Sequence, residues 1–232
     1  YCMCLDREYL DAVKKHNYIP VGLKNKNFSN EWLTDDTLIN ISEKNPYYGE
    51  YTFYYWYWKN MLKTKKENDW IGFCSYRELW GDKKDITDKH STKSLLKSLP
   101  EEWKKYETII GEPFELKRPG VSKILKYGKL SFIRNFKEIL KANWSIRFQF
   151  DMFHGNGYLD EAIKMLPEKD KEDFNNYVRN ESSLNQGNMF ITKSSKIINN
   201  YFSEVFSWLE KCEQVFGFNL KGYSQVRMYT FL

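Results

Sequence analysis

The sequence contains no long apolar segment and little of what builds a metal centre. No apolar run approaches the roughly 20 residues that a helix needs to cross a bilayer, and no secretion signal is recognisable in the opening residues. The four cysteines lack the paired spacing of a zinc site and have no histidine partner nearby. These absences exclude a zinc module and a membrane-spanning helix. They predict a cytoplasmic protein whose cysteines are reduced and buried.

The composition provides enough apolar surface for one sizeable core. The chain has 232 residues, of which 41% are hydrophobic and 18% aromatic. A single α/β domain of this size is ordinary. The formal net charge of +5 is too small to argue for a nucleic-acid ligand. We therefore expect one domain over residues 1–232.

Residues 47–58 form an aromatic-rich stretch with helical periodicity. Tyr51, Tyr54 and Trp58 fall on one face of a helix, and other rings widen that face until the segment is apolar nearly all round. Asn45-Pro46 disfavours helix at Asn45, so the helix should begin near Pro46. Such a segment is typical of a buried core helix. Tyr and Trp carry polar atoms that need partners when buried, and a second interpretation is that some of these rings line a pocket.

The stretch Trp70–Cys74 is a continuous apolar run of strand length, which favours a sheet covered on both faces. Parallel sheets of that kind place ligands beyond the carboxyl ends of their strands. At that point the sequence reads Ser75-Tyr76-Arg77. A guanidinium at a strand end can bind a phosphate through two parallel hydrogen bonds. It can equally form a surface salt bridge, so the strand by itself leaves both interpretations open.

Three blocks of sequence carry a family resemblance, namely residues 40–50 (NISEKNPYYGE), 55–60 (YWYWKN) and 71–77 (IGFCSYR). They resemble the DUF4422 family of bacterial glycosyltransferases, which is associated with capsular and exopolysaccharide synthesis. Looser matches lie at residues 106–110, around His154 and Asp160, and at 188–191 and 223–232. The resemblance implies a GT-A-like (Rossmann-like) α/β/α sandwich with a central mixed, mostly parallel sheet. Since the family pattern continues beyond Leu232, we expect the chain to be truncated at its C-terminus.

The resemblance also implies where a nucleotide-sugar donor binds. Residues 1–5 alternate apolar side chains and predict a first strand, a helix is expected to about His16, and residues 17–21 return to the sheet. In GT-A enzymes the end of the first strand and the segment after the first helix hold the base and ribose. By that likeness the nucleotide contacts Leu5, Asp6, Val21 and Gly22, although ordinary connection chemistry explains each of these residues as well. We expect the donor site to include five further residues, which are Asn45, Tyr54, Ser75, Tyr76 and Asn188. Of these, Asn188 lies in a Gly-Asn turn against an apolar strand, a natural place for an amide to read sugar hydroxyls.

GT-A enzymes commonly hold Mg²⁺ or Mn²⁺ on an Asp-x-Asp motif that neutralises the departing diphosphate. This chain offers no Asp-x-Asp at the end of its central strand. The carboxylates of the adjacent pair Asp35-Asp36 tend to diverge, so helix capping or a solvated surface explains them better than a metal. The chain also has Leu38-Ile39 where the family tends to carry Gly-Asp. We therefore assign no metal ligand, while Mg²⁺ or Mn²⁺ stays open as a cofactor.

A cationic side chain can do the same electrostatic work as a metal. We expect Arg77, helped by Tyr76 and His154, to stabilise the departing diphosphate. The family usually reads His-Tyr-Arg-Arg at this strand end, and the chain has Ser75 and Glu78 in place of the outer two residues, a departure that bears on donor specificity and on activity. His154 is expected in a glycine-flanked loop, which favours a site residue over a core histidine.

Two carboxylates are candidates for the base that accepts the proton of the acceptor hydroxyl. Glu50 lies in the first turns of the aromatic helix, where it is either this base or a residue that favours the helix dipole. Asp160 lies near the start of a helix expected at residues 159–166, where it is either the base or a residue that satisfies backbone donors. Both alternatives stay open for each residue.

Residues 117–150 carry the most uneven charge in the chain, with nine basic residues and one acidic residue interleaved with apolar ones. A basic helix with one apolar face is typical of an interfacial anchor on anionic lipid. An amphipathic helix packed on its own domain has the same pattern. We expect a basic amphipathic insertion here. The resemblance adds a lipid-linked acceptor and peripheral contact with the inner face of the plasma membrane.

Together these features predict a hexosyltransferase that uses a nucleotide-diphosphate sugar. We expect a UDP-linked donor, such as UDP-galactose, and a growing capsular, exopolysaccharide or lipopolysaccharide glycan as acceptor. The alternative is a non-catalytic module that binds a polysaccharide or single-stranded nucleic acid, since aromatic platforms beside positive charge suit either ligand. The aromatic residues cluster in one helix and the charges elsewhere, so we expect no nucleic-acid partner.

Overall fold

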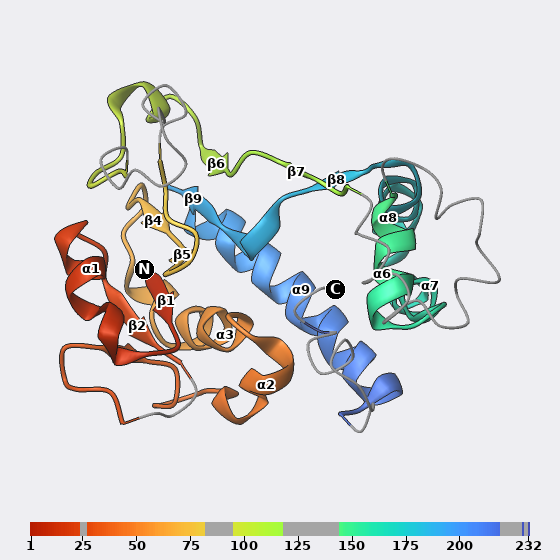
Figure 1. Ribbon diagram of the computed structural model, residues 1–232, viewed down its shortest axis with the longest axis horizontal. Helices are drawn as coiled ribbons and strands as arrows, with labels where there is room; N and C mark the ends of the chain where they lie inside the picture. Colours follow the sequence, from red (N-terminus) through yellow and green to blue (C-terminus); the bar gives the residue numbers. More distant parts are fainter. Residues whose placement is uncertain (24–26, 82–94, 118–143, 219–228, 230–231) are drawn as a thin grey trace. The chain divides into compact units, whose positions relative to one another are not determined.

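A computed structural model describes residues 1–23, 27–81, 95–117, 144–218, 229 and 232 (Figure 1). The chain divides into two compact units. Unit 1 comprises Tyr1–Glu112 and Asn185–Ser203, and unit 2 comprises Pro113–Leu184 and Glu204–Leu232. A single functional domain over the whole chain stays a prediction.

A four-stranded parallel sheet lies in unit 1. Its strand order is β3-β2-β1-β5, with β1 (Cys2–Cys4), β2 (Pro20–Gly22), β3 (Leu33–Thr34) and β5 (Cys74–Ser75). β1 pairs in parallel with β2 on one side and with β5 on the other. The 3₁₀ turn η1 (Arg7–Tyr9) and helix α1 (Leu10–Lys15) connect β1 to β2. The strand–helix–strand opening predicted from the sequence is confirmed.

The apolar run Trp70–Cys74 does not form one parallel strand, contrary to the prediction. Its first part is β4 (Ile71–Gly72), which pairs antiparallel with β9 (Phe190–Thr192), and β9 pairs antiparallel with β6 (Thr108–Ile110). The chain changes sheets at Phe73. The N–H of Phe73 donates to the Phe190 carbonyl at 3.0 Å, whereas the N–H of Cys74 donates to the Tyr1 carbonyl at 2.9 Å. The prediction was wrong because each half of the run pairs with a different partner.

The aromatic stretch forms α2 (Asn45–Tyr48) and α3 (Tyr51–Asn60), and six residues of α3 are buried. Phe73 is the centre of this packing, with ring centroids 5.0 Å from Tyr54, 5.2 Å from Tyr57 and 5.1 Å from Phe190. Two of the buried rings have hydrogen-bond partners: the indole N–H of Trp56 donates to the Thr37 carbonyl at 2.9 Å, and the Tyr54 hydroxyl donates to the Asn188 carbonyl at 2.8 Å. The core-helix interpretation is therefore confirmed for most of these rings.

The remaining short elements of unit 1 are the 3₁₀ turns η2 (Ser42–Lys44), η3 (Leu62–Thr64), η6 (Glu101–Trp103) and η7 (Gln186–Asn188). Cys2, Cys4 and Cys74 lie in a core cluster with Val13 and two tryptophans. All four cysteines of the chain are reduced and buried, as the sequence predicted.

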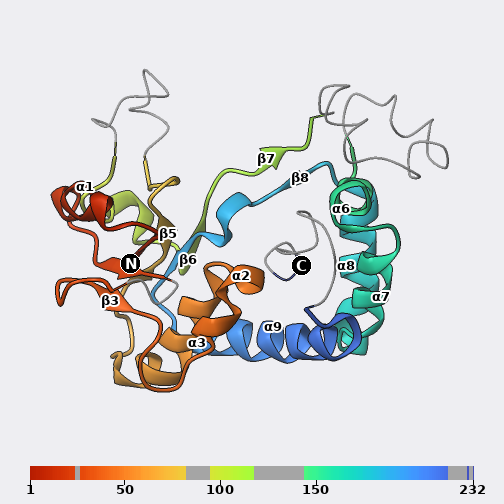
Figure 2. The ribbon, with the colours of Figure 1, turned by 60° about the horizontal axis from the view of Figure 1, so that its bottom comes forward.

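Unit 2 contains a two-stranded antiparallel ribbon and a group of helices (Figure 2). The ribbon pairs β7 (Phe114–Glu115) with β8 (Ser183–Leu184). The helices α6 (Ile146–His154), α7 (Tyr158–Lys164) and α8 (Glu168–Asn180) pack on one another. Helix α9 (Ser195–Phe216) begins in unit 1, and its second half belongs to unit 2, where the indole N–H of Trp208 donates to the Ala162 carbonyl at 2.7 Å.

Most of the basic insertion predicted at residues 117–150 lies outside the described residues. Among the helices that are described, none has the length and hydrophobicity to cross a membrane.

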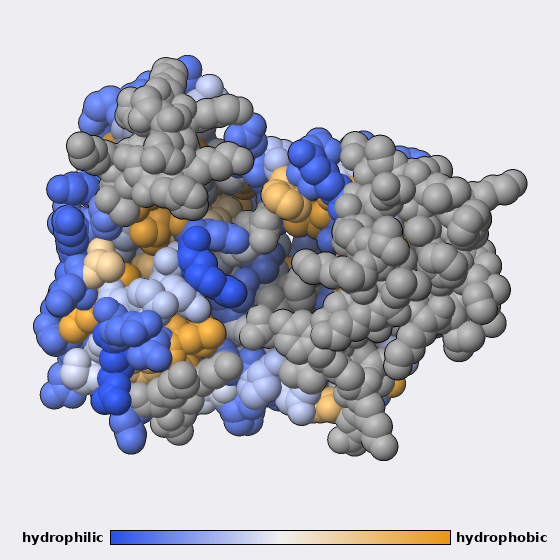
Figure 3. Space-filling model, viewed as in Figure 1, coloured by the Kyte–Doolittle hydropathy of each residue, from blue (hydrophilic) through white to orange (hydrophobic). Residues whose placement is uncertain are grey.

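Hydrophilic residues cover most of the described surface on the face drawn in Figure 3, and apolar residues show there as separate patches. Leu38 and Ile39 are two of the exposed apolar residues, with 77% and 58% of their surface accessible. Leu38 has a φ of 50°, in the left-handed region that favours glycine. That backbone conformation gives a physical reason for the glycine of the family pattern at this place.

Candidate functional site

The carboxyl ends of β1 and β5 lie side by side in unit 1, and the sequence-predicted site residues follow both strands. Met3 and Ser75 are partners in the parallel ladder, and the N–H of Tyr76 donates to the Met3 carbonyl at 3.0 Å. Tyr76 therefore leaves the sheet beside the end of β1, where Leu5 and Asp6 continue the chain. Ligands of open parallel sheets bind at this edge.

Ser75 and Glu78 close a tight turn after β5. The N–H of Glu78 donates to the Ser75 carbonyl at 3.0 Å, and the N–H of Ser75 donates back at 3.3 Å. The two intervening residues, Tyr76 and Arg77, form the tip. The Tyr76 ring packs against Tyr9 with centroids 4.3 Å apart, and the Arg77 guanidinium carbon lies 5.5 Å from the Tyr76 centroid. This packing holds the tip in place at the sheet edge.

The Arg77 side chain is exposed to solvent. Within the part of the chain that the structure describes, its guanidinium forms no ion pair. An exposed guanidinium retains the five donors with which arginine binds phosphate oxygens. The surface salt bridge that the sequence left open is thus not formed with any described carboxylate.

Glu50 precedes α3 and lies within electrostatic reach of this turn. The Asn188 amide Nδ2 donates to Glu50 Oε1 at 3.3 Å. Burial raises the pKa of Glu50 above its usual value, an effect that the Asn188 hydrogen bond and the charge of Arg77 oppose and that the charge of Glu78 reinforces. A carboxylate with a raised pKa is suited to proton transfer near neutral pH.

Asn188 is tied to the same region through its backbone. Its carbonyl accepts a hydrogen bond from the Tyr54 hydroxyl at 2.8 Å. Gly187 precedes it with a φ of 77°, and a Cβ placed on Gly187 would lie 2.0 Å from the Glu78 carboxylate. Sequence reasoning missed Gly187 and the contact that Glu78 makes with it. The Gly-Asn turn was the available signal, but nothing in the sequence pairs it with Glu78.

The four residues expected to hold the nucleotide base and ribose differ in accessibility. Asp6 is exposed and caps η1, with Oδ1 accepting from the Glu8 N–H at 3.5 Å. Val21 is fully buried in β2, and a Cβ on Gly22 would meet the Phe28 ring at 2.3 Å. Leu5 is half-buried. Their contact with a nucleotide stays a prediction, and Asp6 is the one with an exposed side chain.

Asn45 belongs to a buried polar network at the junction of α2 and α3. Its Nδ2 donates to the Gly49 carbonyl at 2.8 Å and to Thr52 Oγ1 at 3.0 Å, and the Thr52 hydroxyl donates to Asp35 Oδ2 at 2.5 Å. Asn45 and Tyr54 are 3% and 0% exposed, so both support the site from the core. Asp35 is fully buried, so a solvated surface was the wrong interpretation for it.

The donor groups in the described ranges do not suit a dedicated divalent-cation site. Among these residues, no group of three or more His, Cys, Asp and Glu side chains could hold a metal ion. Glu50 and Glu78 supply two carboxylates, whereas Mg²⁺ in a protein cage needs oxygen ligands from several positions.

His154 and Asp160 lie in unit 2. His154 is the last residue of α6 and is buried, with its ring centroid 4.8 Å from that of Phe150. The prediction of a glycine-flanked loop was wrong because the helix continues up to Gly155, where φ is 116°. A role of His154 in catalysis stays a prediction.

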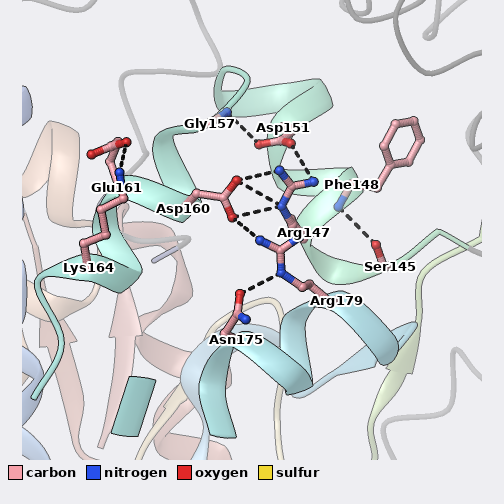
Figure 4. A network of polar contacts seen from close by, with 10 residues as sticks. All are labelled: Ser145, Arg147, Phe148, Asp151, Gly157, Asp160, Glu161, Lys164, Asn175 and Arg179. Carbon is pink, nitrogen blue, oxygen red and sulfur yellow. Dashed lines mark hydrogen bonds and ion pairs between the residues drawn. The ribbon is translucent and has the colours of Figure 1, made fainter. Parts of the chain in front are cut away.

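Asp160 is bound by two guanidiniums (Figure 4). Arg147 donates from Nε to Oδ1 at 3.0 Å and from Nη2 to Oδ2 at 2.5 Å, and Arg179 donates from Nη2 to Oδ1 at 2.9 Å. The hydrogen bonds from Arg147 lower the pKa of Asp160. Asp151 adds an ion pair to Arg147 at 3.5 Å and accepts from the Gly157 N–H at 3.1 Å. This network joins α6, α7 and α8, which neither sequence interpretation of Asp160 foresaw.

Comparisons with known proteins agree with this fold. The family model described as "Domain of unknown function (DUF4422)" matches residues 6–232. No curated protein matches the chain. Among solved structures, the chain is similar to the apo structure of WbbM, a bifunctional glycosyltransferase, with a TM-score of 0.51 and 20% sequence identity. The match covers 92% of this chain and 37% of the WbbM chain. The likeness shows a GT-A-like α/β fold, as the sequence predicted.

Proposed function

Since the chain belongs to the DUF4422 family, we propose that it is a glycosyltransferase that binds a nucleotide-diphosphate sugar at the carboxyl edge of the parallel sheet in unit 1. The observation that carries this proposal is Arg77. It is exposed at the tip of the turn after β5, and it is free of described ion pairs. The neighbouring Tyr9–Tyr76 ring pair offers a flat surface at the same edge. WbbM, whose solved structure is similar to this chain, is a bifunctional glycosyltransferase, which supports the same class of reaction.

Arg77 carries the electrostatic part of the mechanism. In the transfer, a bond forms between an acceptor oxygen and the anomeric carbon of the hexose, and the bond from that carbon to the diphosphate breaks. The departing diphosphate gains negative charge. A guanidinium fixed by its turn stabilises this charge with hydrogen bonds that strengthen toward the transition state.

Glu50 is the better of the two candidate bases. Its pKa is raised, and it lies within the electrostatic reach of Arg77. Asp160 has a lowered pKa and is held by two arginines, which makes it a poor proton acceptor. We assign Glu50 to accept the proton of the acceptor hydroxyl as the new glycosidic bond forms. Asp160 then stabilises the helices of unit 2.

The finer assignments rest on the family resemblance. They comprise a UDP-linked hexose donor such as UDP-galactose, a capsular, exopolysaccharide or lipopolysaccharide acceptor, and a lipid carrier at the inner membrane face. Direct donor contacts are assigned to Leu5, Asp6, Ser75 and Tyr76, whereas the buried residues Val21, Gly22, Asn45 and Tyr54 lie beneath them, and His154 is a further catalytic candidate. A non-catalytic binding module is disfavoured because α3 buries most of the rings that would serve as platforms.

Hydrolysis and transfer assays with a panel of nucleotide sugars test the proposal. We expect turnover of one nucleotide-diphosphate sugar that persists in the presence of a chelator, because Arg77 supplies the positive charge. Complete loss of turnover in chelator, with recovery on addition of Mn²⁺, would overturn the metal-free mechanism. Absence of turnover and of a thermal shift with every nucleotide sugar would overturn the proposed function itself.

A further inference from the structure

Asn188 has a left-handed backbone conformation, and its neighbours hold it in place. It follows Gly187, and both residues have left-handed φ values, 51° for Asn188 and 77° for Gly187. Asparagine tolerates this conformation better than most residues with a side chain. The turn is η7, between β8 and β9, and 138 residues separate Asn188 from Glu50 in sequence. The fold thus brings an amide from a strained turn to a carboxylate at the start of α3.

The Asn188 backbone is anchored by the core. Its carbonyl accepts from the hydroxyl of Tyr54, and the Tyr54 ring is fully buried. That ring stacks on Phe202 with centroids 5.5 Å apart and meets the edge of Phe73 at 5.0 Å. On the other side of the turn, the Glu78 carboxylate occupies the space that a Gly187 side chain would need. The turn is therefore fixed from two directions.

We infer that Asn188 is a positioning residue, whose amide holds the Glu50 carboxylate in one orientation for proton transfer from the acceptor. This inference rests on the proposed function for the role of Glu50. It differs from the sequence-based expectation that Asn188 reads sugar hydroxyls, because the amide hydrogen bond is already made within the protein at 3.3 Å. The hydrogen bond from Asn188 also favours the ionised form of Glu50 and so opposes the effect of burial on its pKa.

Several other groups near Glu50 interact with it electrostatically, and a pH measurement must take them into account. Arg77 favours its anion and Glu78 disfavours it. The hydroxyls of Tyr51, Tyr54 and Tyr201 also lie close enough for Glu50 to raise their pKa values, and these phenols are neutral throughout the acidic range. Any shift of the acidic limb on changing Asn188 alone therefore reports the Asn188–Glu50 contact.

Two substitutions separate the side chain of Asn188 from its backbone. Asn188→Gly keeps the left-handed conformation and removes the amide, and Asn188→Asp keeps the size and replaces the donor by a carboxylate. Asn68→Gly is the matched control, since Asn68 is an exposed asparagine with a φ of 73° outside the site. The readouts are the pH dependence of kcat, the KM for the donor, and the ¹³C NMR titration of the Glu50 side chain, which is identified by its loss in Glu50→Gln.

We expect Asn188→Gly to move the acidic limb of kcat and the Glu50 titration upward by about one pH unit, the size of one lost hydrogen bond to a charged group. Asn188→Asp should move both further, because it adds a third carboxylate beside Glu50 and Glu78. At neutral pH, kcat should fall about 10-fold in Asn188→Gly with little change in KM, and Asn68→Gly should resemble the wild type.

An unchanged Glu50 titration in Asn188→Gly would overturn the inference. A raised KM for the donor with an unchanged pH profile would also overturn it and would indicate that Asn188 recognises the sugar instead. If the wild type shows no transfer, the proposed function fails, but the NMR titration still tests the contact. If Asn188→Gly does not fold, Tyr54→Phe removes the hydroxyl that anchors the Asn188 carbonyl. A smaller upward shift of the Glu50 titration in Tyr54→Phe supports the inference, and no shift overturns it.

Discussion

Two arginine sites, one in each unit, differ in what holds the guanidinium. In unit 1, Arg77 is exposed at the tip of a tight turn and rests on the ring of Tyr76. In unit 2, Arg147 makes a bidentate pair with Asp160 and an ion pair with Asp151, and Arg179 shares the same Asp160. The side chains of Arg147 and Asp160 are each 28% exposed.

This difference separates a ligand-binding arginine from a structural one. The donors of Arg147 are used within the protein, and removing a partner would leave a charge in a partly buried place. The donors of Arg77 face solvent, so their removal costs the fold little. In the sequence both arginines lie beside apolar segments, and only the contacts in the structure distinguish their roles.

The largest expected effects come from replacing each arginine in turn. Arg77→Ala should lower the transfer rate by about 100- to 1000-fold with little change in melting temperature, as expected for loss of a charge that acts in the transition state. Arg147→Ala should instead lower the free energy of unfolding by about 2 kcal/mol, less than a fully buried pair because the network is partly exposed. Kinetics and thermal unfolding of both variants measure the contrast. If Arg77→Ala unfolds the protein while the transfer rate per folded molecule stays normal, Arg77 is a structural arginine and the contrast with Arg147 is wrong.

Arg77→Lys sharpens the same test. Lysine keeps the charge and loses the planar fork, so we expect an intermediate rate, about 10-fold below the wild type. Lys63→Ala is the control, an exposed cation of unit 1 outside the site, and its rate should match the wild type.

Glu50→Gln should separate activity from stability in unit 1. We expect a fall in kcat of about 100-fold, the usual contribution of a positioned base. The pKa of Glu50 is raised in the folded state, so the wild-type protein loses stability as pH rises through this pKa, and the amide removes that loss. Urea unfolding at several pH values should therefore show Glu50→Gln equal to or more stable than the wild type at neutral pH. A large loss of stability would assign Glu50 to the fold instead.

Asp160→Asn should destabilise the protein with the opposite pH dependence. Arg147 lowers the pKa of Asp160, so its contribution is fully present above the unfolded value of about 3.9 and is lost as pH falls through the lower folded value. We expect a loss of about 2 kcal/mol at neutral pH and convergence with the wild type in acid. A constant difference across the whole pH range would show that the ion pairs are not its source.

Asp151→Asn is the matched control with the smallest effect. Burial raises the pKa of Asp151, so its charge is disfavoured in the folded state. Asparagine retains an oxygen to accept from the Gly157 N–H, and the ion pair that is lost is long, at 3.5 Å. We expect a change within about 0.5 kcal/mol in chemical denaturation. A loss as large as that of Asp160→Asn would show that both carboxylates hold the network equally.

The sequence predicted those elements whose signals are local. The strand–helix–strand opening, the start of the aromatic helix near Pro46 and the buried cysteines are all present in the structure. The division of the apolar run at Phe73 was not predictable, because it depends on which strand each half pairs with. The periodicity of apolar residues cannot show that a run of five residues passes from one sheet to another.

Those parts of the candidate site that depend on local signals were also predicted. The position of Arg77 at a strand end follows from local pattern, and so does the presence of Glu50 at the start of a helix. The Asn188–Glu50 hydrogen bond and the Gly187–Glu78 contact join residues far apart in sequence, and the pattern of a single sequence cannot pair them. His154 was misplaced because its flanking glycines suggested a loop, whereas α6 extends through it.

Calorimetric titration of the wild type and of Arg77→Ala with UDP and with other nucleoside diphosphates tests the central claim most directly. The account predicts that the wild type binds a nucleoside diphosphate and that Arg77→Ala, folded as judged by its melting temperature, binds at least about 10-fold more weakly, the worth of one charge-assisted hydrogen bond. Equal affinity of the two proteins would contradict it, since the diphosphate would then be held without this guanidinium.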